Sequence, residues 1–127
     1  MKLILVPLLV LGLSIVNYAE ENNEILHHDK IPVLVGGNSP ENACISKGIV
    51  YGLKDNSFLA VRLGNSTKHK KSDNLHNNDT VWLCDKKGDW MGIVYGKDCG
   101  VGFPIDEKKE YNGSCKFGWS HQNWLKK

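Results

Sequence analysis

Short runs rich in β-branched and aromatic residues, each ended by turn residues, are the feature that most limits what this chain can fold into. Helical periodicity is absent over any useful length of the sequence. Runs of this kind predict strands joined by hairpins, and a chain built from them predicts an all-β barrel or sandwich. The predicted strands are 44–52, 58–63, 80–84, 90–95 and 116–119.

Alternation of side chains along two of these runs predicts which face is buried. In the run 58–63, Leu59 and Val61 point to the core and Arg62 points away from it. In the run 80–84, Val81 and Leu83 are inward, so Trp82 is outward. The turn 85–89 lies between two adjacent runs at hairpin distance, and its Gly88 can adopt the positive φ that such a turn needs.

The first 19 residues have the order of a secretory signal peptide. Lys2 precedes an apolar run, and Ala19 offers a cleavage position. The alternative is an uncleaved membrane anchor, but the apolar run of about 14 residues is shorter than the roughly 20 of a spanning helix. We therefore expect a periplasmic or secreted protein without a stable membrane span after cleavage. The expected organisation is a signal peptide over 1–19, a flexible leader with room for one short strand over 20–42, and a domain over 43–127.

All four cysteines follow the predicted signal peptide. An even number of cysteines in an exported chain predicts two disulfides, for which three pairings are possible. Cys99 and Cys115 bracket a stretch with the composition of a loop, which favours the pair 99–115 and leaves Cys44 with Cys84. A metal site is the alternative, but the chain has no C-x-x-C pair.

Several motifs resemble a known family. They are the segment 58–67, Val81-Trp82-Leu83, Gly88-Asp89-Trp90, Gly118-Trp119 and Trp124-Leu125. Together they resemble the bacterial SH3-like (SH3b) domain over about residues 58–125. The frame from Ala43-Cys44 through Cys99-Gly100-Val101 to Cys115 is similar to an exported, cysteine-containing subgroup from Gram-negative bacteria. Asn65 and Ser120 depart from the family pattern.

The resemblance implies a small SH3-like five-stranded barrel with a disulfide-linked loop. It also implies a wall-associated or partner-binding role, although the function of the exported subgroup is mostly unassigned. Fold alone does not determine function.

Tryptophan and tyrosine side chains are the candidate contact residues, because each combines a large apolar face with a polar group that can bind an extended peptide. Trp82 is the first candidate because it is predicted to be outward. Tyr51 and Tyr95 could line the same groove, although packing between strands explains them equally well. Trp90 and Trp119 each have a nearby glycine and suit the core or its edge. The predicted binding residues are Trp82, Tyr51, Tyr95, Trp90 and Trp124.

Charge and residue spacing argue against several other functions. The formal net charge is +2, and the dense basic run 68–71 suits a solvated loop better than a polyanion site. Basic and aromatic residues are not interleaved, so nucleic acid is not an expected partner. No spacing of histidine, serine and carboxylate residues suggests a catalytic triad, and no cofactor or metal is expected. His27-His28-Asp29 suits a solvated leader better than a metal site.

The sequence therefore favours an exported, non-catalytic module that binds peptide, either cell-wall (peptidoglycan) peptide or an exposed segment of another exported protein. The alternative is an inhibitor or immunity-type protein that blocks an exported lytic enzyme with the loop 97–115. A loop made rigid by a crosslink loses less entropy on binding, which suits such a role.

Overall fold

The structure, a computed structural model, describes residues 26–37 and 40–127 and is nearly all β. The predicted signal peptide, residues 1–19, and residues 20–25 of the leader lie outside the described residues. The all-β class is confirmed, and each of the predicted strands is present. The strands are β1 (Leu34–Val35), β2 (Ser46–Val50), β3 (Leu59–Arg62), β4 (Lys71–Leu75), β5 (Thr80–Lys87), β6 (Trp90–Tyr95), β7 (Lys109–Glu110), β8 (Lys116–His121) and β9 (Leu125–Lys126), with the 3₁₀ helix η1 (Gln122–Trp124) between the last two.

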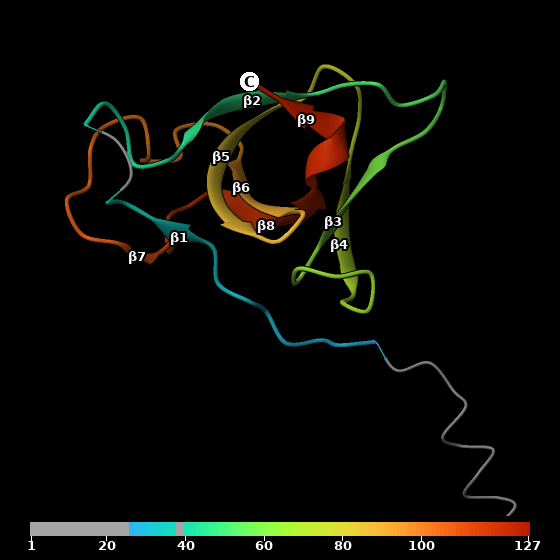
Figure 1. The fold of residues 1–127 in the computed structure, drawn as a ribbon, viewed down its shortest axis with the longest axis horizontal. Helices are drawn as coiled ribbons and strands as arrows, with labels where there is room; N and C mark the ends of the chain where they lie inside the picture. The colour runs from blue at the N-terminus through green and yellow to red at the C-terminus, as the bar shows by residue number, and fades with distance from the viewer. Residues whose placement is uncertain (1–25, 38–39) are drawn as a thin grey trace, which may run out of the picture.

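Seven strands form one sheet in the order β4-β3-β8-β6-β5-β2-β9, and β1 pairs separately with β7. Figure 1 shows the large sheet curling around one of its own faces, with β1 and β7 lying outside the curl. The expected five-stranded barrel is thus replaced by an open seven-stranded sheet, because β4 and β9 form its two edges and do not pair with each other. The additional strands are short or polar: β4 has the sequence KSDNL, of which only Leu75 is buried.

The concave face of the sheet encloses an inner core. Alternate residues of β3, β5 and β6 contribute to it, as the period-two pattern predicts. Leu59 and Val61 are buried here, and so are Val81 and Leu83, which confirms the predicted inward faces. The inner core consists of Val50, Leu59, Val61, Leu75, Val81, Leu83, Met91, Ile93, Tyr95 and Leu125.

The convex face of the sheet is covered as well, and this makes an outer core. The covering layer contains residues 26–37, which we call the N-terminal strap, and the loop between β6 and β8. Val33 and Val35 of the strap are fully buried. The packed structure therefore begins before residue 43, where the sequence placed the start of the domain. The outer core consists of Val33, Val35, Ala43, Cys44, Cys84, Val94, Cys99, Val101, Tyr111 and Trp119.

Hydrogen bonds hold the strap along its length. The Trp119 indole N–H donates to the carbonyl of Ile31 at 3.0 Å. The backbone N–H of Leu34 donates to the Asp85 carboxylate at 3.0 Å. The N–H of His27 donates to the carbonyl of Lys68 at 2.8 Å. These bonds, together with the burial of Val33 and Val35, fix the strap against the sheet.

Both disulfides have the favoured pairing. Cys44 is joined to Cys84, and Cys99 is joined to Cys115. The described residues contain no free cysteine. Two disulfides indicate a protein that folds in an oxidising environment.

Gly118 allows β8 to approach its neighbour β3 closely. A Cβ at this position would lie 2.5 Å from Val61 Cγ1 and 2.9 Å from the carbonyl oxygen of Arg62. Both distances are shorter than van der Waals contact, so a side chain here would push β8 away from β3. The adjacent Trp119 is fully buried, which confirms its predicted place in the core.

Candidate functional site

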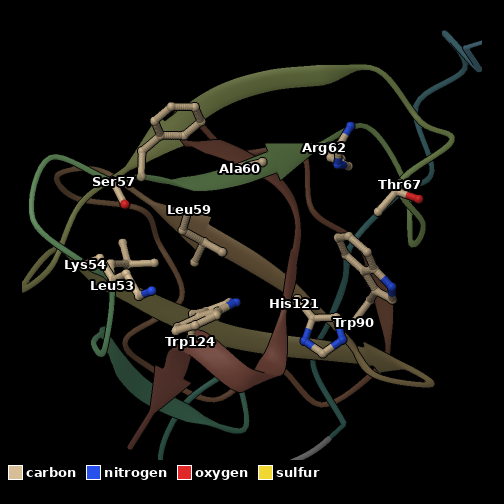
Figure 2. Close-up of a pocket in the computed structure, with 11 residues that line it drawn as sticks. Leu53, Lys54, Ser57, Leu59, Ala60, Arg62, Thr67, Trp90, His121 and Trp124 are labelled. Atoms are coloured by element: carbon tan, nitrogen blue, oxygen red, sulfur yellow. The ribbon is translucent and has the colours of Figure 1, made fainter.

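Three aromatic side chains, Phe58, Trp90 and Trp124, line one open groove. It has a volume of about 480 Å³ and lies over the outward side of β3, next to the ends of β6 and β8 (Figure 2). We call it the Trp90–Trp124 groove. Its lining residues are Leu53, Lys54, Ser57, Phe58, Leu59, Ala60, Arg62, Thr67, Trp90, His121 and Trp124.

Trp90 and His121 form one end of this groove. They face each other across the β6–β8 ladder, where their residues are in register. Their ring centroids are 5.5 Å apart with an interplanar angle of 73°, an edge-to-face arrangement that fixes both rings. Trp90 is half-buried and packs against the outer core, which agrees with its predicted core-edge position.

Trp124 lies toward the opposite end of the groove and comes from η1. The helix is capped by His121, whose side chain accepts a hydrogen bond from the N–H of Asn123. Gly52 lies beside the indole, where a Cβ would make ordinary contact with the ring at 3.6 Å, so it is the positive φ of 79° that favours glycine here. The Trp124 side chain is 38 % exposed, so a large part of its face is open to a ligand.

The outward side of β3 forms the third wall. Phe58 precedes this strand and is 46 % exposed, while Ala60 and Arg62 are half-buried on the same side. The ammonium of Lys71 lies 4.4 Å from the centroid of the Phe58 ring. Alternation placed Arg62 on this side correctly, but only the fold shows that Trp90 and Trp124 lie opposite it.

The other predicted contact residues are not part of this groove. Tyr51 is 41 % exposed and lines a separate depression, with the Lys126 ammonium 4.9 Å from its ring centroid. Trp82 lies on the outward face, as predicted, but the outer core half-buries it and Lys47 covers its ring at 5.0 Å. Tyr95 is only 9 % exposed. Trp82 and Tyr95 both line one small concavity, whereas Tyr51 lies in the separate depression. Tyr95 also packs in the inner core, in agreement with the alternative of packing between strands.

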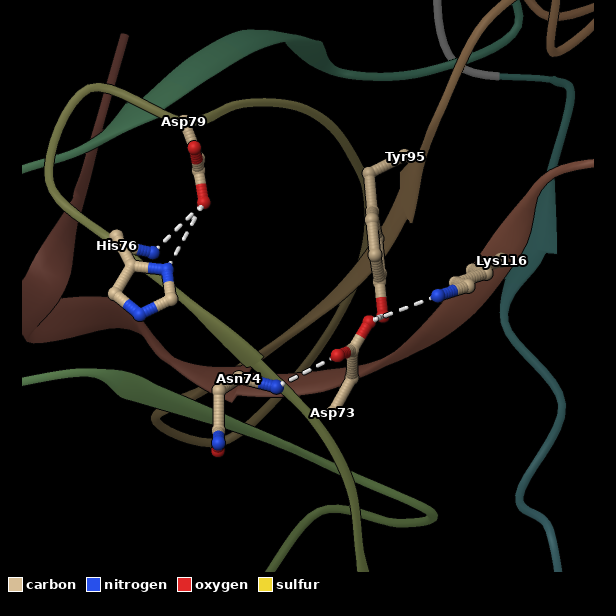
Figure 3. A network of polar contacts seen from close by, with 6 residues as sticks. All are labelled: Asp73, Asn74, His76, Asp79, Tyr95 and Lys116. Atoms are coloured by element: carbon tan, nitrogen blue, oxygen red, sulfur yellow. Dashed lines mark hydrogen bonds and ion pairs between the residues drawn. The ribbon is translucent and has the colours of Figure 1, made fainter.

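Tyr95 instead joins a polar network with Asp73 and Lys116 (Figure 3). Its hydroxyl donates to the Asp73 carboxylate at 2.8 Å, and the Lys116 ammonium lies 3.4 Å from the same oxygen. Burial alone would raise the pKa of Asp73. Hydrogen bonds from Tyr95 and the Asn74 N–H, together with the charge of Lys116, outweigh this and lower the pKa. Burial and the neighbouring Asp73 raise the pKa of Tyr95.

Replacing Tyr95 with phenylalanine tests this network. The loss of one hydrogen bond to a carboxylate should lower the free energy of unfolding by about 1 kcal/mol at pH 7. In the unfolded chain the pKa of Asp73 is about 3.9, and in the folded protein it is lower. The unfolded state thus binds more protons in acid, so this stabilisation is complete above about pH 5 and is lost as pH falls through the folded pKa.

Urea unfolding between about pH 7 and pH 2 should therefore show the difference between wild type and Tyr95→Phe becoming smaller in acid. Tyr51→Phe is the matched control, because Tyr51 is exposed and lies outside the network. A difference that stayed constant down to pH 2 would contradict the role given to Asp73.

Among residues 26–37 and 40–127, no group of three or more His, Cys, Asp and Glu side chains could hold a metal ion. His76 and Asp79 form a local ion pair at 3.9 Å within one turn. No helix in the described segments is long and apolar enough to cross a bilayer.

Sequence reasoning missed Leu53, Lys54 and Phe58 as groove residues. Phe58 could have been predicted as a groove residue, because alternation puts it on the same outward side as Arg62. Leu53 and Lys54 precede a turn at 55–56 and have no distinguishing pattern of their own. Their place beside Trp124 depends on the pairing of β2 with β9, more than 70 residues apart in sequence.

Comparisons with protein-family models, with curated proteins and with solved structures give no match for this chain.

Proposed function

We propose that this protein is an exported, non-catalytic binding module that holds an extended peptide in the Trp90–Trp124 groove. The observation that carries the proposal is the convergence of Trp90, Trp124 and Phe58 on one open groove. Each of these aromatic side chains offers a large apolar face to a ligand. Tryptophan is also enriched among the residues that dominate binding free energies.

Two further observations support export and a peptide ligand. The disulfides suit an oxidising compartment, and the sequence over 1–19 has the order of a signal peptide. The groove is open rather than enclosed, which suits a chain segment more than a small molecule. The proposed ligand is a cell-wall peptide or an exposed segment of another exported protein, and the proposed location is the periplasm or the medium.

A second candidate is an inhibitor of an exported lytic enzyme, and Phe103 favours it. This side chain is 58 % exposed and belongs to the loop closed by Cys99 and Cys115. The Tyr111 hydroxyl holds the same loop by donating to the carbonyl of Cys99 at 2.8 Å. An exposed aromatic residue on a rigid loop is a suitable anchor for a pocket in another protein.

Trp124→Ala is the direct test of the groove. Truncating a central aromatic contact typically costs at least about 2 kcal/mol, so binding should weaken by roughly 30-fold. The measurement is isothermal titration of the oxidised protein with soluble peptidoglycan stem peptides, together with co-sedimentation with purified sacculi. Tyr51→Ala is the matched control, because it removes an exposed aromatic residue outside the groove.

Phe103→Ala separates the two candidates in parallel assays of lysozyme inhibition. Inhibition that requires Phe103 but not Trp124 would favour the inhibitor. Binding of stem peptide that is unchanged by Trp124→Ala would remove the groove from the proposal.

A further inference from the structure

The charged residues of the Trp90–Trp124 groove are all of one sign. Its charged lining residues are Lys54 and Arg62, and none of its lining residues is aspartate or glutamate. The nearby Asp89 is not among the lining residues, and its carboxylate accepts a hydrogen bond from the side-chain amide of Gln122 at 3.3 Å. The groove thus combines an apolar floor with a basic wall in which no lining residue is acidic.

Arg62 is the more buried of the two basic lining residues. It is half-buried, and its Nη1 donates to the carbonyl oxygen of His69 at 2.9 Å. That bond anchors the guanidinium but leaves its charge unpaired, because the ion pairs among the described residues are His76 with Asp79 and Lys116 with Asp73. A half-buried guanidinium is costly without a carboxylate or phosphate partner, and its remaining N–H groups form a fork that matches a carboxylate.

The dense basic run of the sequence lies beside the same groove. Thr67 lines the groove and directly precedes residues 68–71. Lys71 reaches the groove through its contact with the Phe58 ring. The exposed positions of Lys68 and Lys70 suit the expected solvated loop, and Lys71 adds its charge to that of Arg62 and Lys54. Basic residues gathered along a concave surface attract anionic ligands and speed their association.

We infer that the groove selects peptides that carry carboxylates, with a carboxylate of the ligand on Arg62 and an apolar side chain between Trp90 and Trp124. This inference rests on the proposed function and narrows its ligand class. The carboxylate can come from an acidic side chain or from a free C-terminus. Both present the same pair of oxygens to the guanidinium.

The test uses three synthetic pentapeptides and the oxidised full-length domain. The first alternates glutamate with leucine and phenylalanine and has blocked ends, the second replaces each glutamate with glutamine, and the third is the glutamine peptide with a free C-terminal carboxylate. Titration at low salt should give about tenfold tighter binding for the first peptide than for the second. The third peptide shows whether a terminal carboxylate is sufficient.

Arg62→Gln should reduce the tenfold preference to less than about threefold, and Lys54→Gln should reduce it partly. Lys54 is exposed, so its replacement leaves the fold intact even if loss of the Arg62 bond to His69 disturbs the neighbouring loop. Lys109→Gln, on the distant β7, is the matched control and should leave the preference unchanged. The preference of the wild type should also decrease with added salt.

The outcomes separate this inference from the proposed function. If the first two peptides bind equally and Trp124→Ala weakens both, the peptide groove stands and the carboxylate preference is wrong. If none of the peptides binds, or if binding is unaffected by both Trp124→Ala and Arg62→Gln, both proposals are overturned.

Discussion

Replacing Cys44 and Cys84 together with alanine should lower the free energy of unfolding by about 4 kcal/mol. The pair closes a loop with a sequence separation of 40, and a disulfide stabilises mainly by restricting the unfolded chain, more so for longer loops. The second pair, Cys99 and Cys115, has a separation of 16, and its removal should cost about 3 kcal/mol. A domain of this size has a total stability of only about 5 to 15 kcal/mol, so either loss is large.

Guanidinium unfolding followed by circular dichroism measures both variants against the oxidised wild type. Each double variant serves as the control for the other, because each retains one disulfide. A larger loss for the pair Cys99 and Cys115 would show that loop length does not control the stabilisation here.

Trp119→Ala should lower the free energy of unfolding by about 3 to 5 kcal/mol. The indole is completely buried in the outer core, so its removal leaves a cavity between the sheet and the strap. It also removes the N–H that donates to the carbonyl of Ile31. Both effects act on the same contact, through which the strap is attached to β8.

Trp119→Phe is the graded control, because it retains much of the apolar volume but lacks the indole donor. In urea unfolding, its free energy of unfolding should fall by less than that of the alanine variant. Limited proteolysis within residues 26–35 should become faster in the alanine variant, since the strap loses its main contact. A cost below about 1 kcal/mol for Trp119→Ala would show that this packing contributes little.

The central strands of this fold were predictable because each one buries a full face. Alternation in β3 and β5 identifies the inward residues directly, and Gly88, at φ 61°, forms the hairpin turn as expected. β4 could not be predicted in this way, because its sequence is polar and it exists as a strand only through its pairing with β3. One short strand was expected within residues 20–42, and β1 lies there, but the distant residues that bury Val33 and Val35 could not be predicted.

The candidate groove was predictable only in part. Trp90 and Trp124 were identified because an accessible tryptophan offers a large apolar face and one N–H donor to a ligand. Trp82 met the same criterion, but the outer layer that half-buries it is formed by distant segments. The unpaired state of Arg62 could not be inferred from the sequence either, since it depends on which carboxylates the fold brings near.

The position of β8 has a consequence for how this chain is made. β8 joins β3 and β4 on one side to β6, β5 and β2 on the other, yet it consists of residues 116–121, near the end of the printed sequence. While the chain emerges from a ribosome or a translocation channel, the two halves of the sheet have no connecting strand between them. The sheet can therefore be completed only after residues 116–121 have emerged, so the strands made before them lack their connecting partner until then.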